Sequence, residues 1–258
     1  MLPCRLFVDP PAEGAWNMAV DEALLDQAAD EGLASLRFYR WCEPTLSLGY
    51  FQRYDEREQH APSGGAAVVR RLSGGGALIH DRELTYSLCL PASHPLARET
   101  VKLYEAAHEA LIETLAERGI AASLHGDPAT TPPAEQPHEP FLCFARRTSA
   151  DVVLTAPYAA ASPPNKIVGS AQRRRRGAVL QHGALLLETS PAAPELPGLD
   201  RVGGASLAAD ELIAPWSERL AARLNLQLNR ADLETTGALQ SCKKHYAKHV
   251  SAAWLARR

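Results

Sequence analysis

The chain has 258 residues, of which 46% are hydrophobic and 22% are charged. A chain of this length can bury a substantial core, and this composition is ordinary for a soluble globular protein. The formal net charge of −3 gives no electrostatic case for nucleic-acid binding, and no segment reaches the roughly 18 consecutive apolar residues of a membrane span.

The N-terminus carries Arg5 and Asp9 and lacks a long apolar stretch, so we expect no signal peptide and a cytoplasmic protein.

The cysteines are scattered without close pairs. Their spacing fits neither a zinc site nor a Cys-x-x-Cys motif, and their odd number argues against a pure disulfide framework. We therefore expect no metal site and five reduced thiols, one of which could act as a nucleophile: Cys4, Cys42, Cys89, Cys143 and Cys242.

The first part of the chain predicts one helix followed by strands. Residues 16–28 place apolar side chains at the helical period, with Asp21, Glu22 and Asp26 off that face. A turn at Glu43 and Pro44 joins two of the strand-like runs that follow. These runs cover residues 36–41, 45–51, 66–72 and 84–90.

A second helix is predicted over residues 100–118, with Gly119 as its stop signal. Residues 126–140 hold five prolines, so we expect a long mobile loop there, of the kind that often forms a lid or a binding loop. Pro215 must lie in the first turn of a helix or break it. Strands are predicted at 151–155, 166–171 and 178–188, and helices at about 210–224 and 238–257.

The order of these elements bears on the fold class. Strands follow one another in runs and do not alternate strictly with helices. Such runs favour an α+β fold with a mixed sheet over a doubly wound one.

Three consecutive glycines, Gly74, Gly75 and Gly76, follow a strand-like run and are flanked by Arg71 and His80. Glycines beside a strand are costly, so the backbone there needs positive φ angles or lies in contact with a ligand. The spacing differs from the dinucleotide fingerprint, and no Lys-Ser or Lys-Thr follows as in a phosphate-binding P-loop. The block therefore predicts a pocket wall built from backbone, or else a tight hairpin without a ligand.

A second glycine-bearing block begins at Lys166, at the start of a predicted strand. Its ammonium group could polarise a carbonyl or hold a carboxylate or phosphate, although a solvated lysine at a strand end is the simpler interpretation. His182 in the next strand is favoured as a buried structural histidine over a catalytic one. The run 173–176, four arginines, indicates an exposed hairpin turn or, alternatively, a docking site for an acidic protein.

Cys143 follows the proline-rich segment, in the sequence Pro-Phe-Leu-Cys-Phe. A cysteine in a loop is a better candidate nucleophile than a strand cysteine such as Cys89, which usually only packs. A free thiol has a pKa of about 8.5, so catalysis requires a cationic neighbour or a base. Lys166 or one of the arginines could supply that charge.

Taken together, the blocks resemble the superfamily of lipoate–protein ligases and octanoyltransferases, which includes the biotin–protein ligases. The glycine block 70–81 with its continuation 83–87, the lysine block 166–172 and the segment 180–183 each resemble a family motif. Residues 40–52 are similar to an upstream family strand pair. The blocks occur in the family's order within roughly residues 5–190.

The resemblance implies a mixed, largely antiparallel β-sheet flanked by helices, related to the core of class II aminoacyl-tRNA synthetases. It implies one catalytic domain over residues 1–258, with a helical C-terminal portion at about 205–258. It further implies that the glycines accept an acyl chain and that Lys166 contacts the carbonyl end of that chain. The residues implied at the acyl site are Arg71, Ser73, Gly74, Gly75, Gly76, Ala77, His80, Gly169, Ser170, Ala171, His182 and Gly183.

Within the superfamily, Cys143-Phe144 and the helical C-terminus resemble the Gram-positive type of octanoyltransferase, whereas the third glycine reads more like the ligases. The transferase resemblance implies that Cys143 carries an octanoyl group from acyl carrier protein to a lipoyl-domain lysine, without a cofactor. The acceptor would be the glycine cleavage H protein or a dehydrogenase E2 subunit. The alternatives are an ATP- and Mg²⁺-dependent lipoate–protein ligase, an amidotransferase between lipoyl domains, and a binding protein without turnover.

Overall fold

The computed structural model describes residues 1–126, 140–155, 164–202 and 207–257. The predicted loop at 126–140 lies, apart from its two end residues, outside the described residues. The α-helices are α1 (Gly14–Asp30), α2 (Thr100–Ala116), α3 (Leu199–Val202), α4 (Ala209–Arg223), α5 (Ala238–His249) and α6 (Ala252–Leu255). The strands are β1 (Leu2–Val8), β2 (Ala34–Tyr39), β3 (Thr45–Leu48), β4 (Ala67–Arg70), β5 (Leu78–His80), β6 (Glu83–Leu90), β7 (Ala122–Leu124), β8 (Val152–Leu154), β9 (Lys166–Arg175), β10 (Ala178–Leu186) and β11 (Leu226–Arg230).

An eight-stranded sheet forms the centre of the fold, in the order β11-β1-β2-β6-β10-β9-β8-β7. The pairs β11–β1 and β1–β2 are parallel, and the other pairs in this sheet are antiparallel. A smaller sheet has the order β4-β3-β5. The predicted α+β fold with a mixed, largely antiparallel sheet flanked by helices is therefore confirmed.

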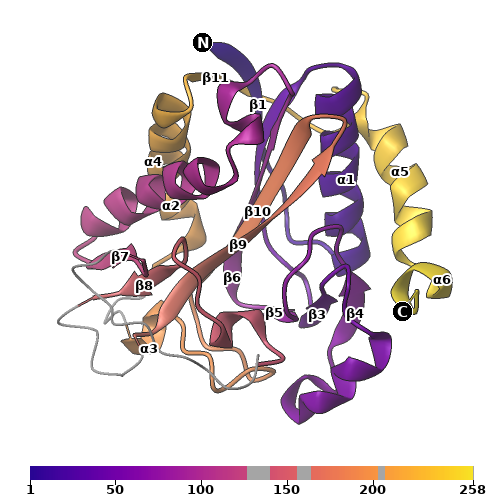
Figure 1. Ribbon diagram of the computed structural model, residues 1–258, viewed down its shortest axis with the longest axis vertical. Coiled ribbons are helices and arrows are strands. Elements are labelled where there is room, and N and C mark those ends of the chain that lie inside the picture. The colour runs from indigo at the N-terminus through magenta and orange to yellow at the C-terminus, as the bar shows by residue number, and fades with distance from the viewer. Residues whose placement is uncertain (127–139, 156–163, 203–206, 258) are drawn as a thin grey trace.

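Helices cover both faces of the large sheet (Figure 1). On one face, Leu84 and Leu88 of β6 belong to the same hydrophobic cluster as Trp216 of α4 and several side chains of α2. On the other face, Cys89 packs in a cluster with Leu24 of α1 and with part of α5. All eight residues of β6 are buried. Its apolar side chains Leu84, Tyr86, Leu88 and Leu90 alternate with Glu83, Thr85 and Ser87, as expected for two different sheet faces.

The two strands expected at 36–41 and 45–51 do not pair with each other. The first is β2, in the large sheet, and the second is β3, in the smaller sheet. β3 pairs instead with β4 and β5, which flank the glycine block. The small sheet thus holds the glycine block against the large one.

Helix α1 differs from the expected amphipathic helix, because two of its acidic residues, Asp21 and Glu22, are not on a solvated face. Asp21 is 1% exposed and Glu22 is 3% exposed. Both carboxylates are paired, Asp21 with Arg37 and Glu22 with Arg175, Lys248 and His249. Buried charges require such partners, and those partners lie far away in the sequence.

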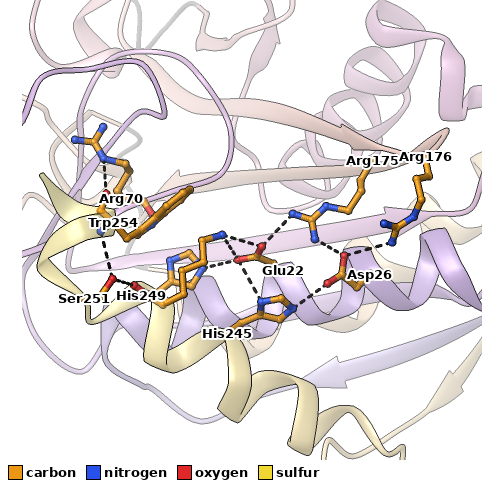
Figure 2. Close-up of polar contacts among 10 residues, drawn as sticks. Glu22, Asp26, Arg70, Arg175, Arg176, His245, His249, Ser251 and Trp254 are labelled. Carbon is orange, nitrogen blue, oxygen red and sulfur yellow. Dashed lines mark hydrogen bonds and ion pairs between the residues drawn. The ribbon is translucent and has the colours of Figure 1, made fainter. Parts of the chain in front are cut away.

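The arginine run 173–176 was expected to form an exposed turn, but only Arg176 lies in one. Arg176 and Gly177 form a two-residue turn with φ values of 47° and 85°, as a tight hairpin between twisted strands requires. The preceding arginines belong to β9. Arg175 pairs with Glu22 and Asp26, and Arg176 also pairs with Asp26 (Figure 2). Arg176 has a second partner in Asp30. Two of the four charges are thereby neutralised by α1.

The C-terminal part corrects two expectations. Pro215 lies in the interior of α4 and does not break it. Proline cannot donate to the carbonyl four residues earlier, and that oxygen, on Glu211, accepts a hydrogen bond from Arg118 at 2.9 Å instead. The single helix expected at 238–257 is two, α5 and α6, and Ser251 caps the second by accepting from the Trp254 amide. The region at about 205–258 also contains β11.

Among the described residues, the helices are all too short or too polar to cross a membrane.

The contact between α1 and α5 predicts a stability that depends on pH. Burial lowers the pKa of His249 below its usual 6.5. Burial also disfavours ionised Glu22, but hydrogen bonds from His249, Lys248 and Arg175 outweigh this and lower the pKa of Glu22 below its usual 4.5. As the pH falls, His249 therefore takes up a proton at a higher pH in the unfolded chain than in the folded chain. The same is true of Glu22, over a lower range of pH.

We expect the free energy of unfolding to be highest above about pH 6.5 and to fall as the pH drops through the unfolded pKa of His249. Urea unfolding at pH 7.5 and pH 5.5 measures this change, and His249→Gln should make it smaller. An unaltered pH dependence in the variant would contradict this role of His249.

Candidate active site

The glycine block forms a loop between β4 and β5, and the Arg71 side chain holds it. The Arg71 guanidinium is buried. It donates to the carbonyl oxygens of Gly74 at 2.8 Å and Gly76 at 2.6 Å, and also to that of Ser47 at 2.8 Å. Gly75, between these two, has a φ of 90°, which favours glycine. Arg71 thus fixes a loop that has no side chains of its own to pack.

Lys166 is not a solvated lysine at a strand end. Its side chain is 2% exposed, and its Nζ lies 2.9 Å from Oδ2 of Asp151. The ammonium group also lies 3.3 Å from the carbonyl oxygen of Cys143 and 3.4 Å from that of Arg146. These contacts hold one positive charge beside the cysteine.

Gly169 makes room for that ammonium group. A Cβ at position 169 would lie 2.7 Å from Cε and 2.9 Å from Nζ of Lys166, closer than real Cβ atoms come. Gly183 on β10 also leaves no room for a side chain, because a Cβ there would lie 2.7 Å from the Gly169 carbonyl oxygen. Both glycines of the second block are therefore required by close approach.

We expect Gly169→Ala to lower the rate of the catalysed reaction about 100-fold, because the new methyl group displaces the Lys166 ammonium. The stability should also fall, since the displaced ammonium is the buried counter-ion of Asp151. Single-turnover kinetics and urea unfolding measure the two effects. Gly65→Ala is the matched control, because a Cβ there meets nothing within 4 Å. Normal turnover in Gly169→Ala would show that the ammonium position is unimportant.

Cys143 opens a short 3-10 turn, Cys143–Ala145, and is linked to the glycine block through the backbone. Its amide donates to the carbonyl oxygen of Ala77 at 2.7 Å, and the Ala77 amide donates to that of Phe141 at 3.0 Å. A Cβ on Gly75 would lie 3.9 Å from Cys143 Sγ. Cys143 is half-buried, whereas Cys4, Cys89 and Cys242 are buried.

A cavity of about 440 Å³ brings these groups together, within the usual range for small-molecule sites. Of the residues predicted from sequence, Arg71, Gly74, Gly75, Gly76, His80, Cys143, Lys166, Gly169, Ser170, Ala171, His182 and Gly183 line it. Ser73 and Ala77 are buried and do not line the cavity. Ser73 contacts it indirectly, through His182.

The cavity wall also contains residues outside the acyl site that the resemblance implied. They are Met18, Tyr39, Leu78, Thr85, Tyr104, Phe144, Arg146, Arg147, Thr148, Asp151 and Gln172. Asp151 is the most consequential, since it is the counter-ion of Lys166. An aspartate that precedes a strand has no distinctive signal in the sequence, so only the paired geometry identifies it.

His182 is a structural histidine whose ring also forms part of the cavity wall. Its Nδ1 lies 3.1 Å from Oδ2 of Asp21, and its Nε2 lies 2.6 Å from Oγ of Ser73. Burial alone would raise the pKa of Asp21, but the bond from His182 and the charge of Arg37 lower it overall. Because Asp21 is ionised, it accepts the proton of Nδ1, which fixes the orientation of the imidazole.

His80 is held at the other end of the wall. It stacks on Trp41 with the ring centroids 3.8 Å apart, and its Nδ1 contacts Glu83. Glu83 also accepts the hydroxyl of Thr85 at 2.7 Å.

A third histidine, His108 of α2, was not singled out in the sequence. Its Nδ1 donates to the carbonyl oxygen of Ala150, so its Nε2, at 2.6 Å from Ser170 Oγ, accepts the serine proton when the ring is neutral. Burial lowers the pKa of His108, which favours that neutral form. His108 thereby links Ser170, in the strand that begins at Lys166, to Ala150, the residue before Asp151.

Together these groups can support acyl transfer: a thiol, a buried ammonium beside it, and a cavity that continues along a glycine loop. Among the described residues, no group of three or more His, Cys, Asp or Glu side chains is arranged to hold a metal ion.

Comparison with known proteins matches this architecture. The model of the lipoyl protein ligase A/B catalytic domain matches residues 13–195. Octanoyltransferase LipM of Macrococcus caseolyticus is 37% identical over 177 residues, which cover 66% of this chain and 61% of that relative. The alignment thus spans less than two thirds of the Macrococcus protein. Octanoyltransferase LipM of Kyrpidia tusciae is 30% identical over an alignment that covers 97% of each protein.

The fold has a solved counterpart in a bi-partite lipoate protein ligase from Thermoplasma acidophilum, whose structure was determined together with work on its E2 lipoyl domain. The TM-score is 0.73 at 20% identity, and the match covers 99% of this chain and 97% of the other. At this level of identity the likeness concerns the fold alone.

Proposed function

Because this chain belongs to the lipoyl protein ligase A/B catalytic domain family, we propose that it is an octanoyltransferase of lipoate biosynthesis. It moves an octanoyl group from acyl carrier protein to a lysine of a lipoyl domain, through a thioester on Cys143. Residues 1–258 act in this reaction as one catalytic domain. The observation that carries the proposal is the placement of Cys143, Lys166 and the glycine loop on one cavity. The two relatives named octanoyltransferase support the choice of reaction.

The first half-reaction forms the acyl-enzyme. The Cys143 thiolate attacks the carbonyl carbon of the octanoyl thioester, and a tetrahedral intermediate with a negative oxygen forms. The intermediate collapses by breaking the bond to the sulfur of the carrier, which leaves as a thiol with the proton that Cys143 gave up. The octanoyl group is now a thioester of Cys143.

The second half-reaction regenerates the thiol. The ε-amine of the acceptor lysine attacks the Cys143 thioester, an amide forms, and the bond to Sγ breaks. The amine proton returns to the sulfur. Each step exchanges one acyl bond for another, so the proposed reaction needs neither ATP nor an oxidant or reductant.

Lys166 provides the positive charge for both half-reactions. Its ammonium lies 3.3 Å from the Cys143 carbonyl oxygen and is held by Asp151. A fixed charge in a site that excludes water stabilises a thiolate and a developing oxyanion far more than it would in bulk solvent. Backbone amides of the glycine loop add hydrogen bonds to the same oxygen in this mechanism.

The acyl tail lies along the glycine loop, where no side chain fills the space. Each buried methylene contributes about 0.8 kcal/mol, so about seven carbons provide about 5–6 kcal/mol before binding entropy is subtracted. His80, Leu78 and Met18 belong to the wall of the same cavity. The tail therefore supplies enough energy for recognition, while Cys143 and Lys166 act on the carbonyl end.

An assay of the whole reaction separates this proposal from the alternatives. The chain is incubated with octanoyl-acyl carrier protein and a lipoyl domain, with and without ATP, and the mass of the lipoyl domain is followed. We expect octanoylation that is independent of ATP. A ligase would instead require ATP and release pyrophosphate with free lipoate. An amidotransferase would accept only an acylated lipoyl domain as donor, and a binding protein would modify nothing.

A further inference from the structure

Arg70 is fully buried and faces away from the acyl cavity, toward the C-terminal segment formed by α5 and α6. Its Nε donates to the carbonyl oxygens of Trp254 at 3.2 Å and Leu255 at 3.1 Å, and its Nη2 donates to that of Leu255 at 2.7 Å. In return, the Trp254 indole donates to the Arg70 carbonyl oxygen at 2.9 Å. Figure 2 shows the two side chains together at the end of the polar contacts along α5.

The other side of the same guanidinium holds the turn after β3. Nη1 of Arg70 donates to the carbonyl oxygens of Gly49 at 2.8 Å and Gln52 at 2.7 Å. Gly49 in turn lies directly against the glycine loop, because a Cβ there would be 2.1 Å from the Gly75 carbonyl oxygen. Gly49 therefore lies between the Arg70 guanidinium and Gly75, which is part of the cavity wall.

The next residue in the chain completes the connection. Arg71 points the opposite way and holds the carbonyl oxygens of Gly74 and Gly76. Arg70 ends β4 and Arg71 directly follows it. These two adjacent arginines therefore link two different surroundings. One links to the C-terminal segment and the other to the acyl cavity.

The C-terminal segment is itself fixed to α1. Lys248 lies 2.8 Å from both carboxylate oxygens of Glu22, and His249 lies 3.0 Å from one of them. His245 contacts Asp26 at 2.9 Å. These partly buried ion pairs and hydrogen bonds are the polar contacts drawn in Figure 2. They give α6 a defined position from which its carbonyl oxygens meet Arg70.

We propose that Arg70 is a positioning residue that couples the docking of the C-terminal segment to the geometry of the glycine loop, and so to acyl transfer. This inference rests on the proposed function for its effect on rate. A glycine loop has no side chains to fix it, so its position depends on the groups that hold its carbonyl oxygens and pack on its backbone. A guanidinium with five donors in a plane can bridge two segments in this way, and a lysine cannot.

Two substitutions test the coupling from its two sides. Arg70→Lys keeps the positive charge but loses the hydrogen bonds that join the C-terminal segment to the turn after β3. Trp254→Phe keeps an aromatic ring and removes the indole donor to Arg70, together with part of the ring that packs on Lys248 and His249. It is the milder change and guards against a variant that fails to fold. Arg176→Gln is the control, because Arg176 lies at the opposite end of the contacts in Figure 2 and pairs only with Asp26 and Asp30 among the ion pairs of the described residues.

The first measurement is the single-turnover rate of octanoyl transfer onto Cys143 at saturating donor, at a temperature where each variant is folded. We expect a fall of about 10- to 100-fold in Arg70→Lys and a smaller fall in Trp254→Phe. A residue with a merely structural role would lower the thermal midpoint and leave this rate unchanged.

The second measurement is amide hydrogen exchange in a peptide that covers the glycine loop, which needs no substrate. Exchange should rise in Arg70→Lys and Trp254→Phe and stay at the wild-type rate in Arg176→Gln. Unchanged exchange, or faster exchange with an unchanged transfer rate, would overturn the coupling. If the wild-type protein formed no octanoyl adduct, the proposed function would be wrong, and exchange alone would still decide whether Arg70 couples the two segments.

Discussion

Cys143→Ala should abolish acyl transfer, with a loss of rate on the order of 10⁴ or more, as is typical when a covalent nucleophile is removed. Cys143 lines the cavity proposed to hold the acyl chain, and the ammonium of Lys166 lies 3.3 Å from the Cys143 carbonyl oxygen. Its side chain is half-buried and packs near the glycine loop. Removal of the thiol should therefore remove the chemistry and leave the fold intact.

The matched control is Cys42→Ala, because Cys42 is exposed and is not part of the cavity. Transfer from octanoyl-acyl carrier protein to a lipoyl domain, followed by mass spectrometry, measures both variants. The control should be fully active. Full activity of Cys143→Ala would mean that the acyl group reaches the acceptor without a thioester at this residue.

Lys166→Met should lower the transfer rate by about 10²- to 10³-fold, since it removes the buried charge proposed to stabilise the developing oxyanion. It should also destabilise the protein by about 3 kcal/mol, because Asp151 would remain buried without its counter-ion. The two effects have different origins, and a second substitution separates them.

The double variant Lys166→Met, Asp151→Asn removes both charges together. It should recover most of the stability in urea unfolding and none of the rate, because a neutral pair needs no counter-ion but cannot stabilise an oxyanion. Recovery of the rate together with the stability would show that Lys166 contributes only to folding.

The parts of the site that sequence alone predicted are those with a local signal. Three consecutive glycines indicate a backbone that needs positive φ angles or lies in contact with a ligand, and Gly75 has such a φ. The lysine block begins a strand as expected, and the family resemblance drawn from these blocks is confirmed. The structure also places Cys143 on the same cavity, although its role as nucleophile stays a prediction.

The parts that sequence missed depend on contacts between distant segments. Asp21 and Glu22 look like the solvated face of a helix, yet Arg37 and the C-terminal helix bury them. Asp151 becomes significant only when β8 and β9 bring it beside Lys166. Pro215 stays inside a helix because Arg118, almost a hundred residues earlier, satisfies the freed carbonyl. Local patterns contain no information about such partners.

The central claim is that the acyl group passes through a thioester on Cys143, and trapping that intermediate tests it most directly. The wild-type chain is mixed with octanoyl-acyl carrier protein without ATP, and its intact mass and peptide masses are measured. We expect one octanoyl group on the peptide that contains Cys143, and we expect it to disappear when a lipoyl domain is added and becomes octanoylated. The absence of this adduct, with transfer that proceeds only when ATP is supplied, would contradict the account.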